Sequence, residues 1–371
     1  MRVSSLKTAQ RVERVNNSLF KIISYGLSND YPQKCLEVLQ SSGTGTHCVD
    51  TKAKFLSGES FVNIELEKLK FGTLKGGEFR RKLAFDMAVF QGFAVHVTYN
   101  GLLEKVELKY IPFEHCRLGA NKTPNGSFVF NNKIAIHPDW GGRVKRPRPE
   151  EVEYIDVYSD DLEVIKEQIT TAGGFEKWKG QIYWYSVDGL GQYPMASFDS
   201  VITDMNTEDG IATVKNRNAK NNFFPAGIIV TKGRNIPDGD SEAKKQYEEE
   251  YDDEKGSLRE LQGDEKAFKL WHVRIENDEE IPKFIPIQTT DGDKLFTYSE
   301  SSVQKNIGKV FGQPPILRYD LIPGKLGTST EIKDAYNFYN TLTSLERQQI
   351  GDVLTEITGM DYSIKALEYA Y

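Results

Sequence analysis

Features that carry chemistry in many proteins are scarce in this chain. It has 3 cysteines and 5 histidines among 371 residues, too few and too scattered for a disulfide framework. No apolar run approaches the roughly 20 residues that a membrane-spanning helix needs. The N-terminal stretch also lacks the apolar core of a secretion signal. We therefore expect reduced, structural thiols in a cytoplasm, no export and no membrane partner.

Motifs of catalysis are missing as well. The sequence contains no GxxxxGK[ST] phosphate loop, no GxSxG nucleophile turn and no GxGxxG after a strand. Histidine adjoins cysteine at His47-Cys48 and at His115-Cys116. We interpret these pairs as half-buried neighbours, with a shared zinc site as the alternative, because structural zinc is usually held by CxxC-type pairs. No cofactor, no metal and no enzymatic activity are predicted.

One pattern is similar to an enzyme signature. Pro237-Asp238, followed by Glu242 and Lys244, resembles the PD…(D/E)xK arrangement of metal-dependent nucleases, in which carboxylates hold Mg²⁺ and a lysine steadies the attacking water. The two elements are only four residues apart here, and acidic residues in the first turn of a helix are favoured by its dipole. A helix capped by Ser241 is therefore our preferred interpretation, and the nuclease remains the alternative.

The negative charge of the chain is concentrated in one segment. Residues 240–265 hold 11 acidic and 4 basic side chains, a balance of −7, which equals the net charge of the whole chain. The other residues are therefore neutral on balance. Aromatic residues make up 11% of the chain, so disorder throughout is excluded.

Hydrophobic periodicity predicts an α+β chain. Helices are expected at 12–23, near Leu36 and Leu39 after Pro32, at 46–56 between Thr46 and Gly58 as caps, at 79–90, 194–220, 241–262, 294–311 and 328–357. Strands are expected at 95–99, 106–110, 127–130, 133–137, 153–158, 180–186, 228–230, 267–275 and 283–288. Asn100-Gly101 between the first two strands is a strong hairpin signal.

The segment 138–150 is predicted to be a loop, because proline, glycine and arginine dominate it. Its basic residues are Arg143, Lys145, Arg146 and Arg148. A solvated loop or a contact with a protein partner is the preferred interpretation of these residues, and phosphate contact is the alternative.

The long helices have narrow apolar stripes. The stripe of 241–262 consists of Tyr247, Tyr251, Leu258 and Leu261. Such a helix cannot bury much area alone, and a helix that is polar nearly all round often packs between subunits. We therefore predict an oligomer in which these four residues pack subunits together.

Four segments together resemble the portal proteins of tailed phages, of the HK97-related kind. They are Ser28-Asn29-Asp30-Tyr31-Pro32-Gln33 with the helix to Gly58-Glu59-Ser60-Phe61; Gly191-Gln192-Tyr193-Pro194 with the long helix to Asn221-Asn222-Phe223-Phe224-Pro225-Ala226-Gly227; Ile307-Gly308-Lys309-Val310-Phe311-Gly312-Gln313-Pro314-Pro315; and Gly327-Thr328-Ser329-Thr330-Glu331 with the helix to Leu354. Gln313 stands where the family has an apolar residue, and the usual proline near the middle of the last helix is absent.

The resemblance implies a division of the chain into the parts of a portal subunit. The implied parts are a wing at 1–190, a stem helix at 191–220, a clip at 221–240, a second stem helix at 241–266, a wing return with tunnel loop and helix at 267–327, and a C-terminal helix or crown at 328–371. The implied DNA-channel loop is Gln288, Thr289, Thr290, Asp291, Gly292, Asp293 and Lys294, and the implied clip contacts to terminase or adaptor are Lys220, Lys232 and Arg234.

The resemblance also implies partners. A portal forms a homo-oligomeric ring, usually of twelve subunits, at one capsid vertex of the virion, assembled in the host cytoplasm. Double-stranded DNA passes through it without sequence recognition, and the terminase large subunit, a head-tail adaptor and the major capsid or scaffold protein bind it. Another ring-forming virion adaptor is the alternative within the same class. An acidic helix suits a conduit, because cations that neutralise many phosphates would hold the duplex.

Overall fold

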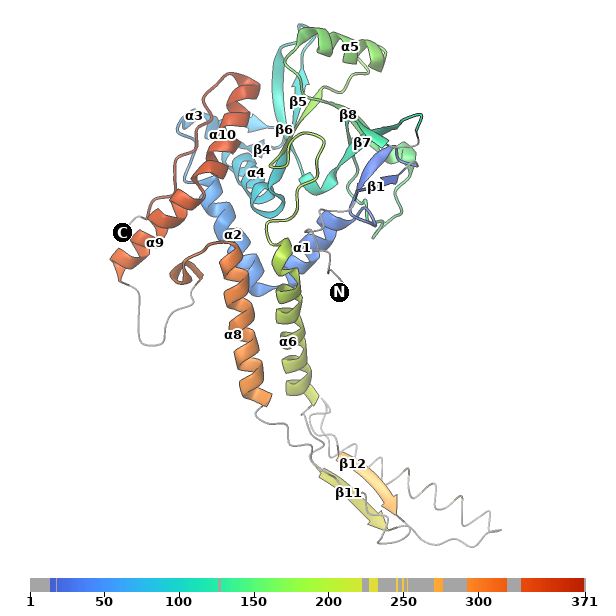
Figure 1. Cartoon of the computed structure of the whole chain (residues 1–371), viewed down its shortest axis with the longest axis vertical. Helices are drawn as coiled ribbons and strands as arrows, with labels where there is room; N and C mark the ends of the chain where they lie inside the picture. Colours follow the sequence, from blue (N-terminus) through green and yellow to red (C-terminus); the bar gives the residue numbers. More distant parts are fainter. Residues whose placement is uncertain are drawn as a thin grey trace, which may run out of the picture. The chain divides into compact units, whose positions relative to one another are not determined.

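The computed structural model describes residues 14–17, 19–125, 128–221, 227–232, 245, 249, 252, 270–275, 292–318 and 328–369. The chain forms two compact units. The larger unit is built from 1–206 and 303–371, and the smaller from 207–302. Helices α6 (Ile202–Asn221) and α8 (Gly292–Val310) contribute residues to both (Figure 1).

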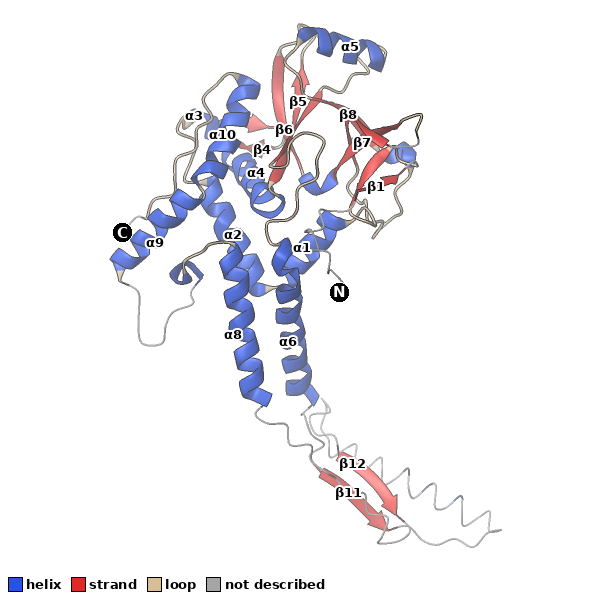
Figure 2. Ribbon diagram, in the orientation of Figure 1, coloured by secondary structure: helices blue, strands red, loops and turns tan. Residues whose placement is uncertain are grey.

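An eight-stranded sheet forms the centre of the larger unit (Figure 2). Its order is β1-β2-β7-β8-β9-β10-β5-β6. The strands are β1 (Arg14–Asn17), β2 (Ile22–Tyr25), β5 (Gly92–Tyr99), β6 (Lys105–Ile111), β7 (Cys116–Lys122), β8 (Phe128–Ile136), β9 (Glu153–Val157) and β10 (Gln181–Ser186). All neighbours are antiparallel except β9 and β10. Parallel neighbours need a crossover, which α5 (Leu162–Ala172) provides.

Helices pack against this sheet and against each other. Helix α4 contacts β5 and β6, and α2 and α10 pack on α4. The helices of the larger unit are α1 (Tyr31–Ser41), α2 (Gly43–Ser57), α3 (Glu65–Lys68), α4 (Gly76–Phe90), α5, α9 (Ser329–Leu342) and α10 (Ser344–Thr358), with short 3₁₀ turns at Phe113–His115, Pro149–Glu151, Asp199–Val201 and Pro315–Arg318 and a small hairpin of β3 (Lys70–Phe71) and β4 (Leu74–Lys75). This mixture confirms the predicted α+β class.

In the smaller unit, β11 (Gly227–Lys232) and β12 (Leu270–Ile275) form a parallel pair. The predicted strands at 228–230 and 267–275 are thereby confirmed. The expected strand at 283–288 lies outside the described residues, and so does most of the expected helix at 241–262.

The first expected helix, at 12–23, is wrong. Strands β1 and β2 form a hairpin there, and β2 continues the sheet by pairing Ile22 with Gly119 and Ile23 with Leu118. All four residues of β2 are buried, so the strand lacks the alternation of a half-buried strand and its run of apolar residues fits a helix equally well. Sheet pairing with β7, far along the chain, decides between the two.

The C-terminal helix is interrupted where one continuous helix was expected. It ends at Leu342 and resumes at Ser344. The hydroxyl of Thr343, which is 2% exposed, donates to the Tyr339 carbonyl at 2.8 Å. A hydroxyl that bonds the carbonyl four residues back competes with the helical ladder and bends it. Helix α9 begins where the sequence predicts, and Thr328 and Glu331 form a capping box at its start.

Smaller differences have local causes. Helix α2 begins one turn earlier than expected, because Ser42 caps it by accepting from the Gly45 N–H at 2.9 Å, whereas Thr46 lies inside it. The predicted strands at 127–130 and 133–137 are one strand, β8, which passes Asn132 at φ 55°. Strand β7 and helix α5 were not predicted. The β5–β6 hairpin is confirmed, with a loop at 100–104.

A fully buried arginine connects the hairpin, α1 and β7. The Arg117 side chain is 0% exposed, and its donors reach Asn29 Oδ1 (2.7 Å), Asn29 O (2.8 Å), Gln33 Oε1 (3.1 Å), Glu114 O (2.8 Å) and Cys116 O (2.8 Å). The cation also lies over the rings of Tyr25 (5.6 Å) and Trp140 (5.4 Å). Its charge is thus balanced by oxygen dipoles and aromatic faces rather than by a carboxylate.

Replacing Arg117 with alanine is expected to lower the free energy of unfolding by about 3 kcal/mol or more, because several buried acceptors lose a charged donor. Urea unfolding followed by circular dichroism measures this. Arg143→Ala is the control: Arg143 is exposed and pairs with Glu37 at 2.5 Å, so it should change stability by no more than about 0.5 kcal/mol. Equal effects of the two substitutions would contradict the role given to Arg117.

A buried acid makes stability depend on pH. Burial raises the pKa of Asp86 to about 8, above the unfolded value of 3.8, although Asp86 accepts from the Phe113 N–H at 3.0 Å. Between these values the folded chain binds the proton more tightly, so this contribution to stability is full below about pH 4 and is lost as pH rises towards 8. Asp86→Asn should therefore reduce the decline of stability between pH 5 and pH 8, measured by urea unfolding. A slope that is unchanged in the variant would contradict this assignment.

Candidate functional site

The larger unit holds α6 and α8 side by side where the two helices join it. Met205 of α6 and Ile307 of α8 are both 0% exposed and belong to the main core cluster. Asn306 donates to the Asp204 carboxylate at 3.3 Å across the pair. These contacts make the paired helices the main candidate site, because α6 contains most of the segment that the portal resemblance interprets as a stem helix.

Tyrosines fix the segment that precedes α6. The Tyr31 hydroxyl donates to Asp199 Oδ1 at 2.5 Å and accepts from the Ala196 N–H at 3.0 Å. The Tyr25 hydroxyl donates to the Pro194 carbonyl, and its ring stacks on Tyr193 with centroids 4.1 Å apart. The first resembling segment therefore contacts the second through Tyr31, at Ala196 and Asp199.

These tyrosines act as neutral hydrogen-bonding groups. Burial, with smaller contributions from Cys35 and from the bond to Asp199, raises the pKa of Tyr31 far above its ordinary value. Burial likewise raises the pKa of the Cys35 thiol to about 12. Both groups stay protonated at neutral pH, which suits a structural contact rather than acid–base chemistry.

The third resembling segment attaches α8. Gly312 ends the helix with φ 60°, a conformation that glycine adopts without strain. The Gln313 side chain, 5% exposed, donates to the Cys48 carbonyl at 2.5 Å and to the Tyr339 hydroxyl at 3.2 Å. The glutamine that departs from the family pattern therefore ties α8 to α2 and α9.

Away from this attachment α6 is mostly exposed. From 206 to 216 only Ile211 is buried. Within the smaller unit Lys215 pairs with Glu300 of α8, so this exposed lysine has a partner in its own chain. An exposed helix of this polarity gains stability by packing against further neighbours.

The structure describes only part of the predicted site. Gly292, Asp293 and Lys294, expected in a loop, are the first residues of helix α8. Lys220 belongs to α6 and Lys232 ends β11. Outside the described residues lie Gln288, Thr289, Thr290, Asp291, Arg234, Tyr247, Tyr251, Leu258 and Leu261, and with them the nuclease candidates Asp238, Glu242 and Lys244.

Helix α8, predicted from the sequence at 294–311, lies beside α6. The expected second stem helix at 241–266 lies almost wholly outside the described residues and stays a prediction. The sequence missed the roles of Tyr31, Asp199 and Gln313, since each acts through a partner more than 25 residues away.

The described residues contain no group of three or more histidine, cysteine or acidic side chains placed to hold a metal. His47 instead contacts the Leu317 carbonyl at 3.0 Å, and burial lowers the pKa of His115. All three cysteines are free and buried, as expected for structural thiols. Among the described helices none is both long and apolar enough to cross a membrane.

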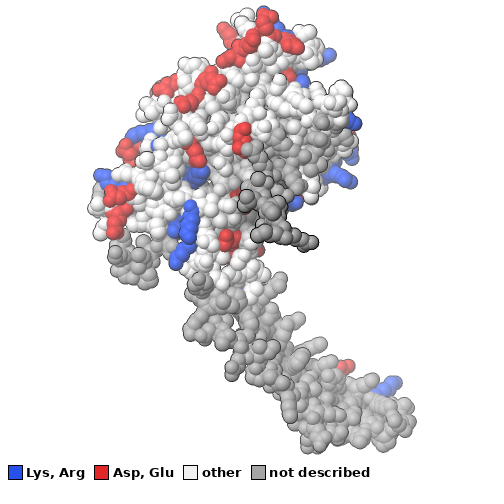
Figure 3. Space-filling view, viewed as in Figure 1, with Lys and Arg blue, Asp and Glu red and all other residues white. Residues whose placement is uncertain are grey.

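Surface charge is mixed on the face in Figure 3, where acidic side chains gather at the end that carries α5. Exposed acids on and beside that helix are Asp160, Asp161, Glu163 and Glu167. No continuous basic surface is visible on this face of the larger unit. Such a face does not offer the many phosphate contacts of a tight DNA-binding protein.

Comparisons with known proteins give a likeness of fold. No protein-family model matches the chain, and no curated protein does. A chain from the neck of an empty GTA particle, computed with C6 symmetry, matches with a TM-score of 0.52 and 11% identity over 90% of this chain and 84% of that one. Chains from the neck of a native GTA particle, computed with C12 symmetry, and from the virion of a native gene transfer agent (GTA) particle match with a TM-score of 0.48, at 12% and 13% identity. They cover 90% of this chain and 82% and 83% of those chains. A likeness at that score is too weak to support a function.

Tyr31→Phe tests the tyrosine contact that fixes the start of α6. It removes a donor to Asp199 and an acceptor for Ala196, so unfolding should become easier by about 1–3 kcal/mol. Tyr336→Phe is the matched control, because the Tyr336 ring packs on Phe55 at 5.1 Å while its hydroxyl has no hydrogen bond to a described residue. Urea unfolding of both variants measures the difference in stability. Identical unfolding midpoints for the two variants would contradict the proposed contact.

Proposed function

We propose that this chain is a structural subunit of a phage-like virion and forms the portal-type ring through which DNA enters and leaves. The observation that carries the proposal is the fold likeness to a neck chain, at a TM-score of 0.52 over 90% of this chain. The C6 symmetry of that neck fits a cyclic assembly. The four resembling segments support the finer portal assignment, because two of them meet at Tyr31 and Asp199 and a third attaches α8 through Gln313.

In this proposal α6 and α8 are the paired stem helices. Their bases are fixed by buried contacts in the larger unit, and the clip at 221–240 and the long helix at 241–266 stay the proposed parts between them. The exposed polar length of α6 then packs against a neighbouring subunit or faces the channel. A ring of about twelve subunits, DNA as passing cargo, and terminase, adaptor and capsid or scaffold protein as partners complete the proposal.

We propose a structural rather than a catalytic role for the ring. The tyrosines and the glutamine of the candidate site serve as neutral structural contacts, and the face of the larger unit in Figure 3 carries charges of both signs. A conduit must let a duplex slide, and sliding is favoured when few phosphates are neutralised at once. The proposed function is therefore to position and guide DNA.

The expected outcome in solution is a ring. Light scattering should give a mass near twelve times 42.1 kDa, and negative-stain electron microscopy should show a central hole of about 20 Å or more, wide enough for a duplex whose grooves alone are of order 10 Å. Compact dimers without a hole would contradict the proposal.

A matched pair of variants tests whether α6 packs between subunits. Val214 of α6 is 38% exposed, and Val214→Glu should shift the mass towards single subunits, because the charge would be buried in the interface. Leu102→Glu, at an 80% exposed position in the β5–β6 hairpin, should leave the rings intact. Rings unaffected by Val214→Glu would exclude this packing while leaving the ring itself in place.

A further inference from the structure

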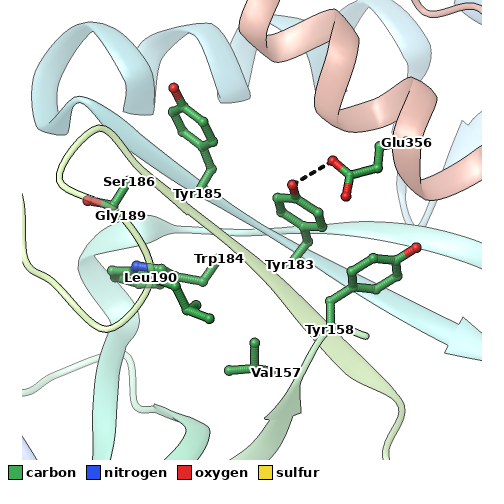
Figure 4. A pocket seen from close by; sticks show the side chains of 9 residues that line it. All are labelled: Val157, Tyr158, Tyr183, Trp184, Tyr185, Ser186, Gly189, Leu190 and Glu356. Atoms are coloured by element: carbon green, nitrogen blue, oxygen red, sulfur yellow. Dashed lines mark hydrogen bonds between the residues drawn. The ribbon is translucent and has the colours of Figure 1, made fainter. Parts of the chain in front are cut away.

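A groove lined by aromatic side chains lies on the larger unit. It has a volume of about 330 Å³ and is formed by the end of β9, by β10, by the loop after β10 and by α10 (Figure 4). Its lining residues are Val157, Tyr158, Tyr183, Trp184, Tyr185, Ser186, Gly189, Leu190 and Glu356. We call it the tyrosine groove. None of these residues belongs to the helix pair described above.

One hydrogen-bond donor among the residues that line the tyrosine groove has no partner. The Trp184 indole Nε1 is buried with no hydrogen-bond acceptor among the described residues, and the residue is only 4% exposed. In Figure 4 its ring is drawn near Leu190 and away from the rings of Tyr158 and Tyr183, and it stacks on Phe113 with centroids 4.4 Å apart. A buried donor without a partner is unfavourable, and an acceptor from outside the chain would relieve it.

The charge of the groove is negative. Glu356 is the only charged residue that lines it. Its carboxylate accepts from the Tyr183 hydroxyl at 2.8 Å and has no cation within 4.0 Å among the described residues. Lys105 already lies over the Tyr158 ring at 5.0 Å, so the ring that adjoins the carboxylate is that of Tyr183. An aromatic ring beside a carboxylate without an ion-pair partner suits an arginine, whose guanidinium stacks on rings and pairs with carboxylates.

Tyrosine- and tryptophan-lined grooves also bind proline-rich segments, because a polyproline II strand is extended before it binds and loses little entropy. The preferred occupant is thus an exposed segment that combines proline with arginine. The chain itself contains one: Arg146-Pro147-Arg148-Pro149, called here the basic segment.

The basic segment has an extended backbone and arginines without ion-pair partners, as such a contact requires. A residue before proline is confined to extended or polyproline II conformations, and Arg148 has φ −112° and ψ 147°. Neither Arg146 nor Arg148 lies within 4.0 Å of a carboxylate of any described residue. The adjacent Val144 is 95% exposed, an unusual position for an apolar side chain without a partner.

The basic segment cannot reach the groove of its own chain. It precedes Glu153, the first residue of β9, whereas the groove begins at Val157, the last residue of that strand. The two sites are thus separated by the length of β9, about 15 Å. The loop is also held in place: the Asp139 carboxylate accepts from the N–H groups of Arg143 and Val144, both at 2.9 Å.

We propose that the basic segment of one copy of this chain occupies the tyrosine groove of the next. An arginine of the segment pairs with Glu356, and its prolines pack on the tyrosine rings. A contact between two different patches is heterologous, and repeated around an axis it closes a ring. The inference rests on the proposed function, since the ring supplies the adjacent copy.

Cross-linking between copies tests the contact. The double variant Val144→Cys with Leu190→Cys places one thiol beside the basic segment and one at the groove, where Leu190 is 57% exposed. The three native cysteines are buried and should not react. A short bis-maleimide should then produce a ladder of covalent oligomers, and either single variant should not produce one.

Leu102→Cys with Leu190→Cys is the matched control, because Leu102 is equally accessible but lies in the β5–β6 hairpin. Adding Arg146→Glu and Arg148→Glu to the double-cysteine variant should lower the cross-linked fraction by at least about tenfold, through like-charge repulsion from Glu356. Glu356→Arg in the same chain should restore it. A cross-linked fraction that does not change when these charges are reversed would overturn the proposed pairing.

The outcomes separate this inference from the proposed function. Rings seen by light scattering without a ladder would overturn the contact and leave the ring assignment standing. If the chain stays monomeric, a synthetic peptide of residues 142–150 is titrated while tryptophan fluorescence is followed, with Trp184→Phe identifying the signal. Binding that Glu356→Arg weakens would support the contact without a ring, and no binding at millimolar peptide would overturn it.

Discussion

The burial of one positive charge organises the larger unit. The Arg117 guanidinium, 0% exposed, has no carboxylate partner and is satisfied only when Asn29, Gln33 and two backbone carbonyls converge on it. A buried charge without such partners would be very costly. The β1–β2 hairpin, α1 and the start of β7 must therefore assemble together, and the stack of Tyr25 on Tyr193 extends this requirement to the segment before α6.

Much of the fold follows from local patterns in the sequence. The 3.6-residue spacing of Phe79, Leu83, Met87 and Phe90 and the alternation along β5 and β6 place their elements correctly, because both signals are contained within a single short segment of the sequence. The hairpin at 14–25 could not be predicted in this way. Its strand β2 is buried on both sides, and only the pairing with β7, nearly 100 residues later, makes it a strand.

The candidate site was harder to predict than the fold. The resemblance to portals drew on residues 28–33, 191–194 and 307–315, but the sequence does not say that Tyr31 meets Asp199 or that Gln313 meets Cys48. Polar helices also give weak signals, because the surfaces that complete them lie on other elements or other copies. The sequence therefore predicts α8 as a helix without showing that it lies beside α6, where the structure places it.

The division of the chain has a consequence for how the molecule can vary. Both ends of the smaller unit leave from helices whose bases are joined by Asp204 and Asn306. The entropy lost on closing a loop grows only with the logarithm of its length, by roughly 0.6 kcal/mol for each doubling. The larger unit is therefore almost indifferent to how many residues are inserted between α6 and α8, so that part of the molecule can lengthen, shorten or change its sequence while the body that carries it stays the same.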